Sequence, residues 1–541
     1  MATVTRPLTA EKSTLAVIID WLTTVDHKKI GIMYLVLNMF FFVLAGVMAL
    51  LIRTQLAWSN LKLIDPDRYN ELFTMHGTSM IFLVIVPIWA GFANYILPLQ
   101  IGARDMAFPR LNAFSFWLLF FGGLVMYSSY LFDSVPNGGW TAYPPLTGPQ
   151  YTPGPNIDFW ILGLHLVGLS SLFGAINFIV TTLNLRAPGM KLLEVPMFTW
   201  SMFVTSAMVL FSTPMLTVAI TLLLADRHFG THFFQASQGG DPLLWQNLFW
   251  FYSHPAVYIM ILPGMGAISE VLQTFSRKPL FGYRFIAFSS VFIAVLGFLV
   301  WAHHMFQVGS SLAVNAFFAG MTMIIAVPTG IKIFNWIATM YGGALRLTSA
   351  MLFAIGFVTM FIIGGLSGVM LGSVPVNWQV HQTYFVVAHI HYVLYGGSVF
   401  AIFASFYYWI PKMTGWMMDE KLGKLHFWVM LFGFNLAFFP QHIVGLLGMP
   451  RRYYTYAAGQ GWEIWNLMST LGAFLIATSV LIFIINFFVS ARAAKSAGAN
   501  PWEAPTIEWA TSSPPPEYNF AKIPTVTRMN PLWEEHPDAG H

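Results

Sequence analysis

The sequence predicts an all-α integral membrane protein, built as a bundle of about twelve transmembrane helices. Two observations lead to this fold class. The chain of 541 residues is 57% hydrophobic and only 9% charged, whereas an average soluble domain carries about a quarter charged residues. In addition, apolar stretches long enough to cross a bilayer, about 20 residues each, recur along the whole chain. Lipid is therefore the expected solvent for most of its surface.

The predicted transmembrane helices follow one another with short connections. They cover residues 30–52, 74–97, 112–132, 159–182, 197–224, 244–268, 285–306, 312–338, 349–371, 383–410, 426–446 and 466–490. This divides the chain into an N-terminal segment of residues 1–29, a membrane domain of residues 30–490 and a C-terminal tail of residues 491–541. The proline run Ser512 to Glu517 predicts an extended strap in that tail.

Lysine and arginine predict the orientation. An even number of spans places both termini on one side, and the loops on that side hold more basic residues than the opposite loops. The tails add Arg6, Lys12, Lys28, Lys29, Arg492, Lys495, Lys522 and Arg528 to the same side. We therefore expect both termini to be cytoplasmic, in the inner membrane of a bacterial cell.

Composition excludes several kinds of site. The chain has no cysteine, which rules out disulfides, thiolate metal sites and covalently attached c-type haem. Histidine is then the strong ligand left for a soft or borderline metal. No basic run is longer than two residues, so we expect no nucleic-acid partner.

Among the histidines inside the predicted spans, where ionisable side chains are costly and usually functional, six are singled out. They are His76, His254, His303, His304, His389 and His391. For a seventh, His165, a hydrogen bond to a neighbouring helix is the better interpretation. His228 and His232 fall in a polar outer loop and are expected to be solvated.

His389 and His391 are two residues apart, which separates their side chains by about 200° around a helix. Imidazoles on opposite faces cannot easily share one metal, but they can bind two cofactors, one on each side. Either histidine alone would be explained equally well by a hydrogen bond to a neighbouring helix.

Two further patterns involve neighbouring histidines. His303 and His304 diverge by about 100° on a regular helix, so both reach one metal only near an unwound helix end. His254 precedes Pro255, which kinks a helix, and the i, i+4 spacing places Tyr258 on the same face as His254. A kinked helix with a polar interface is the simpler alternative for this last pattern.

Together with longer motifs, these residues resemble subunit I of the haem–copper oxidases, of the cytochrome c oxidase type. The resemblance runs from Asp26 to about Glu517. Its motifs are GARDMAFPR at 102–110, WAHHM at 301–305, PTGIK at 328–332 and HIHY at 389–392. The implied function is that of a proton-pumping terminal oxidase, which reduces dioxygen to water with electrons from cytochrome c.

The resemblance implies two haems, expected to be haem A. His76 and His391 match the two ligands of a low-spin haem, and His389 matches the single ligand of a high-spin haem. A haem with two histidines has no open position and passes electrons, whereas a haem with one histidine keeps a position for dioxygen.

The resemblance also implies one copper ion. His254, His303 and His304 match its three ligands, and Tyr258 matches a tyrosine that relatives join covalently to the ligand at His254. Breaking the O–O bond needs four electrons almost at once, which two metals and an oxidisable tyrosine supply together. His254 and Tyr258 are therefore the predicted catalytic pair.

Several other residues are implied to contact the haems. Arg451 and Arg452 match the arginine pair that binds haem propionates, and Arg53 matches an arginine near a substituent of the low-spin haem. Trp140, in the Gly- and Pro-rich outer loop, joins this cofactor-binding set. Without the motifs, two solvated loop charges would be the default interpretation of the arginine pair.

The resemblance implies two proton routes. The first contains Lys332 with Thr329 one turn away, and Ser269 near its entrance. The second begins at Asp105 and continues through Asn94 and Asn112.

The chain departs from its best-known relatives at two places. They carry a glutamate in the second route where this chain has Ala256, and the hydroxyl groups of Tyr252 and Ser253 are expected to take its place. They also use a His-Asp pair for magnesium where this chain has His381 and Gln382, and loss of the carboxylate does not favour a hard cation.

Three other functions were weighed. Some quinol oxidases carry a histidine and a glutamine where this chain has Arg68 and Glu71, which favours cytochrome c as donor. Tyr258 and Lys332 argue against a nitric oxide reductase. A transporter would also have about twelve helices, but it would carry no haem. The expected partners are a subunit II with a dinuclear copper centre, a subunit III, cytochrome c or a c-type haem domain, and the lipid bilayer.

Overall fold

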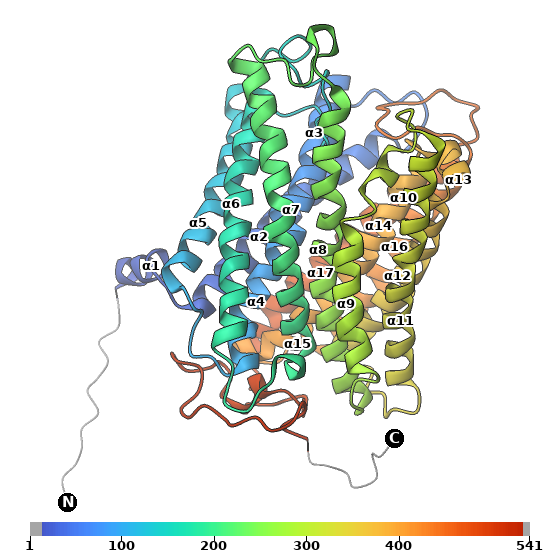
Figure 1. Cartoon of the computed structure of the whole chain (residues 1–541). Coiled ribbons are helices and arrows are strands. Elements are labelled where there is room, and N and C mark those ends of the chain that lie inside the picture. Colours follow the sequence, from blue (N-terminus) through green and yellow to red (C-terminus); the bar gives the residue numbers. More distant parts are fainter. Residues whose placement is uncertain (1–12, 534–541) are drawn as a thin grey trace, which may run out of the picture.

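A computed structural model describes residues 13–533 of the chain, and every regular element in this range is helical. The long helices run side by side in one bundle, with connecting loops at its two ends (Figure 1). Eleven helices of the described residues are long and apolar enough to cross a membrane, and α9 is a shorter apolar helix. The predicted fold class is confirmed. Arg6 and Lys12, two of the basic residues that predict the orientation, lie outside the described residues.

The helices that form the bundle follow one another along the chain. They are α2 (His27–Gln55), α3 (Pro66–Thr78), α4 (Val86–Ile101), α5 (Pro109–Ser128), α6 (Asn156–Asn184), α7 (Met197–His228), α8 (Pro242–Ser276), α9 (Tyr283–Gly297), α10 (Leu312–Ile324), α11 (Ala326–Met340), α12 (Ser349–Gly372), α14 (Tyr384–Val393), α15 (Phe400–Thr414), α16 (Glu420–Leu446) and α17 (Glu463–Ala493). Two short helices, α1 (Thr14–Leu22) and α13 (Val374–Val380), were not expected from the sequence.

Two of the expected spans contain a π-helical turn. In one span η1 (Ser79–Ile85) joins α3 to α4, and in another η6 (Leu394–Val399) joins α14 to α15. Each turn begins three residues after a histidine of the candidate site, His76 and His391 respectively. π-turns inside α-helices are frequent at functional sites.

The expected helix at 285–306 is wrong at its C-terminal end. The α-helix α9 stops at Gly297, and the chain then forms a separate 3-10 turn, η5 (Trp301–Met305). The expected helix at 312–338 is divided into α10 and α11, because Pro328 near the start of α11 has no backbone N–H to continue the earlier helix. Hydropathy alone does not report such breaks, since the residues on both sides remain apolar.

Short polar side chains set the starts of several helices. Asp26 accepts a hydrogen bond from the Lys28 N–H at the start of α2, and Thr383 accepts one from the Phe385 N–H at the start of α14. Such caps satisfy N–H groups that have no partner within the helix. Their positions define where the site-bearing helices enter the bundle.

Close helix contacts hold the bundle together. The helix α2 packs against α4 and also against α17, so the first and last long helices are neighbours. At Gly445 of α16, an added Cβ would overlap the backbone nitrogen of Phe385 in α14. Glycine therefore allows the helix that carries His389 and His391 to lie directly against α16.

The C-terminal tail crosses one end of the bundle, drawn in red at the lower side of Figure 1. Its regular structure within the described residues is a single 3-10 turn, η7 (Ile507–Ala510), so the segment around Ser512 is non-helical, as predicted. Lys412 of α15 donates to the carbonyls of Ala499, Thr511 and Ser512 at 2.9, 2.7 and 3.3 Å. We call this end of the bundle the tail end.

Candidate metal centre and proton routes

Three histidines from two parts of the chain meet at one point. His254 lies in α8, and His303 and His304 lie in the turn η5. Nδ1 of His254 is 3.2 Å from Nε2 of His304, which is 3.0 Å from Nε2 of His303. Among residues 13–533 this is the one group of three or more candidate ligands whose ligand atoms all lie within 4.8 Å of one another. Imidazoles arranged in this way suit copper.

Neighbouring side chains determine which nitrogen these rings present. The Thr322 hydroxyl donates to the Phe318 carbonyl at 2.6 Å and accepts from Nδ1 of His303 at 2.9 Å. A hydrogen on Nδ1 leaves Nε2 of His303 with its lone pair, directed towards the other two histidines. Trp250 stacks on the His304 ring, with centroids 3.8 Å apart. The residues present therefore fit a copper ion with three imidazole ligands.

Tyr258 lies one turn after His254 in α8, and their ring centroids are 4.8 Å apart. Nδ1 of His254 points to the other two histidines, whereas its Nε2 is buried and has no partner among the described residues. A Cβ at Gly297, where α9 ends, would lie 3.2 Å from Cδ2 of Tyr258. The close approach of α9 thus helps to hold the phenol ring beside the imidazole of His254.

The other three histidines share one local feature, because a backbone carbonyl lies next to Nδ1 of each ring. The distances are 2.9 Å from His76 to Ala45, 3.0 Å from His389 to Gly364 and 2.7 Å from His391 to Val387. A carbonyl oxygen only accepts hydrogen bonds, so Nδ1 carries the hydrogen and Nε2 keeps its lone pair. This is the arrangement of a metal-binding histidine whose orientation is fixed by a second contact.

The two histidines of α14 face different neighbours. His389 is close enough to His303 and His304 for their charges to interact, whereas His391 interacts in this way with His76 of α3. The ring of His391 also stacks on Phe438 of α16, with centroids 4.2 Å apart. The structure therefore brings the six histidines together as two groups, one on each side of α14.

Arg53, near the end of α2, is buried and has unused donors. Its Nη2 donates to the backbone and side-chain oxygens of Asn466, both at 3.0 Å, while Nε and Nη1 have no partner among the described residues. The guanidinium lies 5.9 Å from the Tyr384 ring centre, and its charge acts on His391. These free donors beside His391 fit a polar substituent of a haem.

Arg451 and Arg452 lie in the loop after α16, at the end of the bundle opposite the tail. Nε of Arg451 donates to Oε1 of Gln382 at 2.7 Å. Burial, followed by the charge of Arg452, lowers the pKa of Arg451 to about 9. Two neighbouring guanidiniums that are mostly removed from water need negative charge. Gln382 does not supply this negative charge, because an amide is neutral. The two guanidiniums therefore fit the propionates of a haem.

Trp140 connects the two groups of histidines. A Cβ at Gly77, the residue after His76, would lie 3.5 Å from Cβ of Trp140. The Trp140 ring meets Trp250 edge-on, with centroids 5.7 Å apart, and Trp250 stacks on His304. The indole therefore lies between the two positions where haem and copper are expected.

Lys332 is fully buried in α11. Its Nζ donates to the Ser290 hydroxyl at 2.7 Å and to the Ile286 carbonyl at 3.1 Å, both on α9. Neither partner is charged. A lysine without a counter-ion in this setting is costly, which is the usual mark of a functional ionisable group in a membrane.

Thr329 and Ser269 do not touch the amine of Lys332. The Thr329 hydroxyl donates to the carbonyl of Ile325 in the preceding turn, at 3.1 Å. Ser269 is fully buried in α8 and accepts a hydrogen bond at 2.9 Å from the Trp336 side chain, one turn beyond Lys332. These three residues therefore have separate hydrogen-bond partners, and a shared route remains a prediction from the sequence.

Asp105 lies in the loop after α4, at the tail end of the bundle. Burial is the main cause that raises the pKa of Asp105 to about 6, although a hydrogen bond from the Met106 N–H at 2.7 Å acts to lower it. The amides of Asn94 and Asn112 are nearly fully buried, and Oδ1 of Asn94 and both polar atoms of Asn112 have no partner in the described chain. Buried polar atoms of this kind usually bind water.

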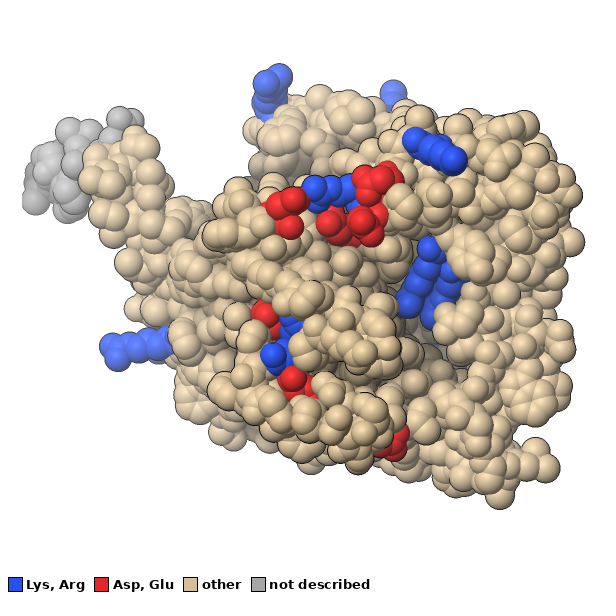
Figure 2. Space-filling view, turned by 90° about the horizontal axis from the view of Figure 1, so that it is seen from above, with Lys and Arg blue, Asp and Glu red and all other residues tan. Residues whose placement is uncertain are grey.

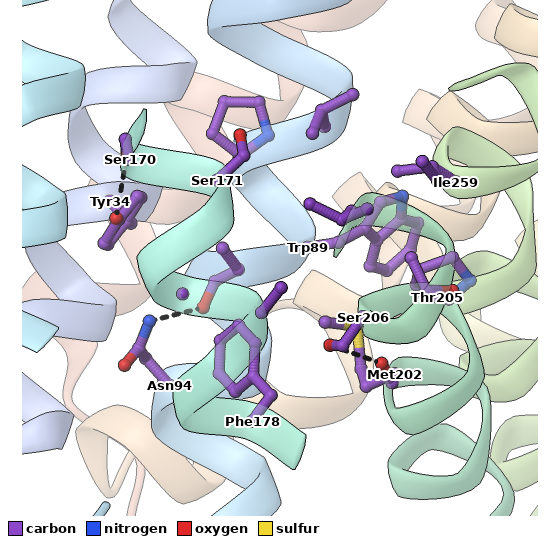
Figure 3. Close-up of a pocket in the computed structure, with 17 residues that line it drawn as sticks. Tyr34, Trp89, Asn94, Ser170, Ser171, Phe178, Met202, Thr205, Ser206 and Ile259 are labelled. Atoms are coloured by element: carbon purple, nitrogen blue, oxygen red, sulfur yellow. Dashed lines mark hydrogen bonds between the residues drawn. The ribbon is translucent and has the colours of Figure 1, made fainter. Parts of the chain in front are cut away.

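A cavity continues from Asn94 into the bundle (Figure 3). Its volume is about 50 Å³, which gives room for roughly three to five water molecules. Its lining is mostly apolar, with hydroxyl groups at several places. Figure 3 shows Tyr34 bonded to Ser170, with Thr205 and Ser206 on the far wall. None of these hydroxyls was singled out from the sequence, because serine and threonine are common in transmembrane helices and only the fold gathers them.

Tyr252 and Ser253 lie in α8, beyond the cavity wall formed by Ile259 of the same helix. Tyr252 is 7% exposed and its ring stacks on Phe82 at 6.2 Å, while the Ser253 hydroxyl is buried without a partner in the described residues. Tyr252 precedes Ile259 by about two helical turns. The hydroxyl pair directly precedes the candidate ligand His254 in the same helix.

The remaining singled-out histidines have ordinary partners. His165 is bonded to the Ile161 carbonyl at 2.9 Å and to the Thr221 hydroxyl at 3.0 Å, as predicted for a helix-interface histidine. His228 is half exposed beside Asp158, and His232 is exposed next to Gln235. Thr322 and Ser290, by contrast, are site residues that the sequence analysis missed.

Comparisons with known proteins agree with this arrangement. Residues 29–475 match the family described as cytochrome c and quinol oxidase polypeptide I. The cytochrome c oxidase subunit 1 of Bacillus sp. (strain PS3) is 50% identical over 99% of this chain and 86% of its own. That of Synechocystis sp. is 52% identical, over 93% of this chain and 90% of its own.

Two further similarities are informative. The quinol oxidase subunit 1 of Bacillus subtilis is 48% identical over 94% of this chain and 79% of its own. A solved haem–copper terminal oxidase dimer, studied by cryo-electron microscopy, superposes with a TM-score of 0.72, although only 20% of residues are identical over 87% of this chain and 84% of that one. At this identity the likeness concerns the fold.

Proposed function

Because this chain belongs to the family of cytochrome c and quinol oxidase polypeptide I, subunit I of the haem–copper oxidases, we propose specific roles for its buried histidines. His76 and His391 hold a low-spin haem, and His389 holds a high-spin haem. His254, His303 and His304 would hold a copper ion.

The chain is the catalytic subunit of a terminal respiratory oxidase, an oxidoreductase of the membrane. One observation carries the assignment of its reaction centre: three imidazole nitrogens from α8 and η5 converge within 4.8 Å, and His389 lies on the neighbouring face of α14. The haems and copper of this family supply electron transfer and a binding place for dioxygen.

The residues of the chain prepare this centre. Carbonyl groups hold the Nδ1 hydrogens of His76, His389 and His391, so Nε2 is the coordinating atom of each. In the copper group, Nδ1 of His254 and Nε2 of His303 and His304 coordinate. This leaves Nε2 of His254 for a covalent link to a ring carbon of Tyr258. That link would replace the imidazole N–H and a ring C–H, with two protons and two electrons passing to dioxygen, the oxidant of the family's reaction.

Protons for water formation reach the centre through buried hydroxyl groups. On one side, Lys332 holds a proton beside Ser290, with Ser269 and Thr329 nearer the two ends of that route. On the other side, Asp105 takes up protons, and Asn94, Asn112 and the hydroxyl-lined cavity carry them inward.

Tyr252 and Ser253 complete the second route in place of the carboxyl group that Ala256 lacks. They directly precede His254 in α8, the helix that also lines the cavity through Ile259, so a hydroxyl that can pass a proton lies beside the dioxygen site. Coupling of this route to proton pumping is the function that we assign to it.

The surroundings of the subunit follow from its chemistry. The electron donor is cytochrome c or a c-type haem domain, through a subunit II that carries a dinuclear copper centre, since the chain has no cysteine to form one. A subunit III is expected beside it. The membrane domain of residues 30–490 spans a bacterial inner membrane with both termini cytoplasmic, in agreement with the distribution of basic residues.

The region of Arg68 and Glu71 bears on the choice between cytochrome c and quinol. Arg68 pairs with Glu71 at 2.8 Å and with Asp133 at 2.6 Å. The face of the molecule in Figure 2 is largely uncharged, and its charged side chains of both signs lie beside one another. A charged, paired cluster is a poor lining for a quinol ring, which favours cytochrome c.

Magnesium is not assigned to the chain. The side chain of Gln382 is engaged by Arg451, and its amide nitrogen is 3.3 Å from Nε2 of His381. Burial and the charge of Arg451 lower the pKa of His381 to about 4. A neutral amide beside a cation is a weak place for a hard divalent ion.

Spectra and metal content of the purified complex test this function. We expect pyridine haemochrome spectra of haem A with one copper for every two haem irons in this subunit, and oxidation of reduced cytochrome c faster than of a quinol. Iron without copper would indicate the nitric oxide reductase alternative, and oxidation of quinol alone would indicate a quinol oxidase.

A further inference from the structure

Asn519 is a residue of the C-terminal tail that is fully buried at the tail end of the bundle. Its φ is 69°, a left-handed conformation that asparagine tolerates better than most residues. Its own backbone is fixed, because its N–H donates to Pro516 at 3.0 Å and its carbonyl accepts from the Thr511 hydroxyl at 2.6 Å. The side chain therefore points into the bundle from a rigid support.

The amide of Asn519 reaches the loop that carries Asp105. Nδ2 donates to the carbonyl of Ala103 at 2.8 Å and lies 3.3 Å from that of Arg104. Lys28 of α2 donates to Oδ1 of Asn519 at 3.3 Å and to the carbonyl of Glu517 at 2.7 Å. One tail residue thus joins the start of α2 to the two residues before Asp105.

The same amide faces the imidazole of His27, which is fully buried. Nδ1 of His27 is 2.6 Å from the carbonyl of Asn94 and must donate to it. Nε2 is 2.9 Å from Nδ2 of Asn519 and 3.1 Å from its Oδ1. A neutral His27 therefore accepts from Nδ2, and a protonated His27 donates to Oδ1, with little movement of either side chain.

His27 belongs to the surroundings of Asp105. The backbone N–H of His27 is bonded to the Asp105 carboxyl group, and Asp26 and Lys28 act electrostatically on both. These are the charged groups that face the imidazole from α2 and from the loop after α4, while α4 contributes the Asn94 carbonyl and the tail contributes the neutral amide of Asn519.

We propose that Asn519 is a positioning residue for proton entry. It holds His27, and through it the backbone of Asn94, at the mouth of the Asp105 route, so the C-terminal tail forms part of that mouth. This inference rests on the proposed role of Asp105 as the mouth of the second proton route.

Two substitutions separate the effect of the Asn519 side chain from that of its backbone conformation. Asn519→Gly removes the side chain but keeps the left-handed backbone. Asn519→Asp keeps the shape and the acceptor but loses the donor that a neutral His27 needs. Asn500→Gly is the matched control, because Asn500 is a tail residue whose amide bonds only to Ala504 in the tail. Asp105→Asn tests the route itself.

The measurement is proton uptake and dioxygen consumption of the whole complex in vesicles between about pH 6 and 9. Asn519→Gly is expected to slow uptake on the order of tenfold, the effect of losing one hydrogen bond to a charged group, with unchanged haem spectra. Burial lowers the pKa of His27 to about 4, so the imidazole of the parent is neutral over this range. Asn519→Asp should therefore fall below the parent rate at the alkaline end and approach it only at the acidic end, where the new carboxylate favours a protonated His27. Asn500→Gly should match the parent throughout.

The outcomes distinguish the role of Asn519 from that of the Asp105 route. Parent-like uptake in Asn519→Gly, or in Asn519→Asp across the whole pH range, while Asp105→Asn is impaired, overturns the role of Asn519 alone. Parent-like uptake in Asp105→Asn removes the proposed route, and the inference with it. If Asn519→Gly fails to assemble, the isosteric Asn519→Asp still decides through its pH profile.

Discussion

Replacement of Thr322 by valine should weaken the copper site without touching a ligand. The Thr322 hydroxyl accepts the Nδ1–H of His303 at 2.9 Å and so keeps Nε2 of His303 available for copper. Valine has nearly the same shape but no acceptor, so Thr322→Val leaves this N–H unpaired, at a cost of about 1–3 kcal/mol. The ring then loses its fixed orientation and tautomer.

Losses of this kind of second contact lower metal affinity by roughly 10–100-fold, which corresponds to about 1.4–2.7 kcal/mol. Copper per haem iron, measured after equilibration with a graded series of a copper chelator, should fall at correspondingly lower chelator concentrations in Thr322→Val. Thr478→Val is the control, because the hydroxyl of Thr478 is exposed and bonds only to its own helix at 2.9 Å. Equal chelator resistance of Thr322→Val and the parent would refute the assigned tautomer of His303.

Three further changes test other parts of the structure. Tyr252→Phe should slow turnover and pumping by about 10²-fold, the contribution of one positioned proton-transfer group, with intact haem spectra. The same change at the exposed Tyr341 should have no such effect. Normal proton uptake in Tyr252→Phe would exclude the Tyr-Ser pair from the route. Gly445→Ala should destabilise the subunit by about 1–3 kcal/mol through overpacking against α14, seen in thermal unfolding and haem retention, whereas Gly320→Ala, with open space around its Cβ position, should not. Because burial raises the pKa of Asp105 to about 6, its carboxyl infrared band, identified by its loss in Asp105→Asn, should change from protonated to ionised as the pH rises through about 6; a transition near 4, the value of a solvated aspartate, would contradict the burial of this side chain.

Local patterns in the sequence were sufficient for much of the fold and for part of the site. Runs of apolar residues located the spans, since burial in lipid requires them wherever the helices pack. The two-residue spacing of His389 and His391 predicted two cofactors, because the geometry of a helix fixes the directions of its side chains. These inferences needed no knowledge of contacts between distant segments.

Other features depend on contacts between segments far apart in the sequence. The break between Gly297 and Trp301, which allows adjacent histidines to share one position, is not visible in hydropathy because its residues are apolar. The contact of Thr322 with His303 and that of Asn519 with His27 join segments 19 and 492 residues apart. Nothing in the neighbourhood of a threonine or an asparagine indicates such a partner before the chain is folded.

The carbonyl contacts of His76, His389 and His391 have a consequence for variation in this protein. Their acceptors belong to the main chain, which every amino acid possesses, so no single replacement at Ala45, Gly364 or Val387 deletes the oxygen itself. Substitutions at those positions can change the size of the side chain, but the Nδ1–H of each imidazole keeps its acceptor. The copper ligand His303 lacks this protection, because its partner is a side chain and one codon change removes it. Inherited loss of function through a misdirected imidazole should therefore fall on the copper half of the centre more often than on the haem half.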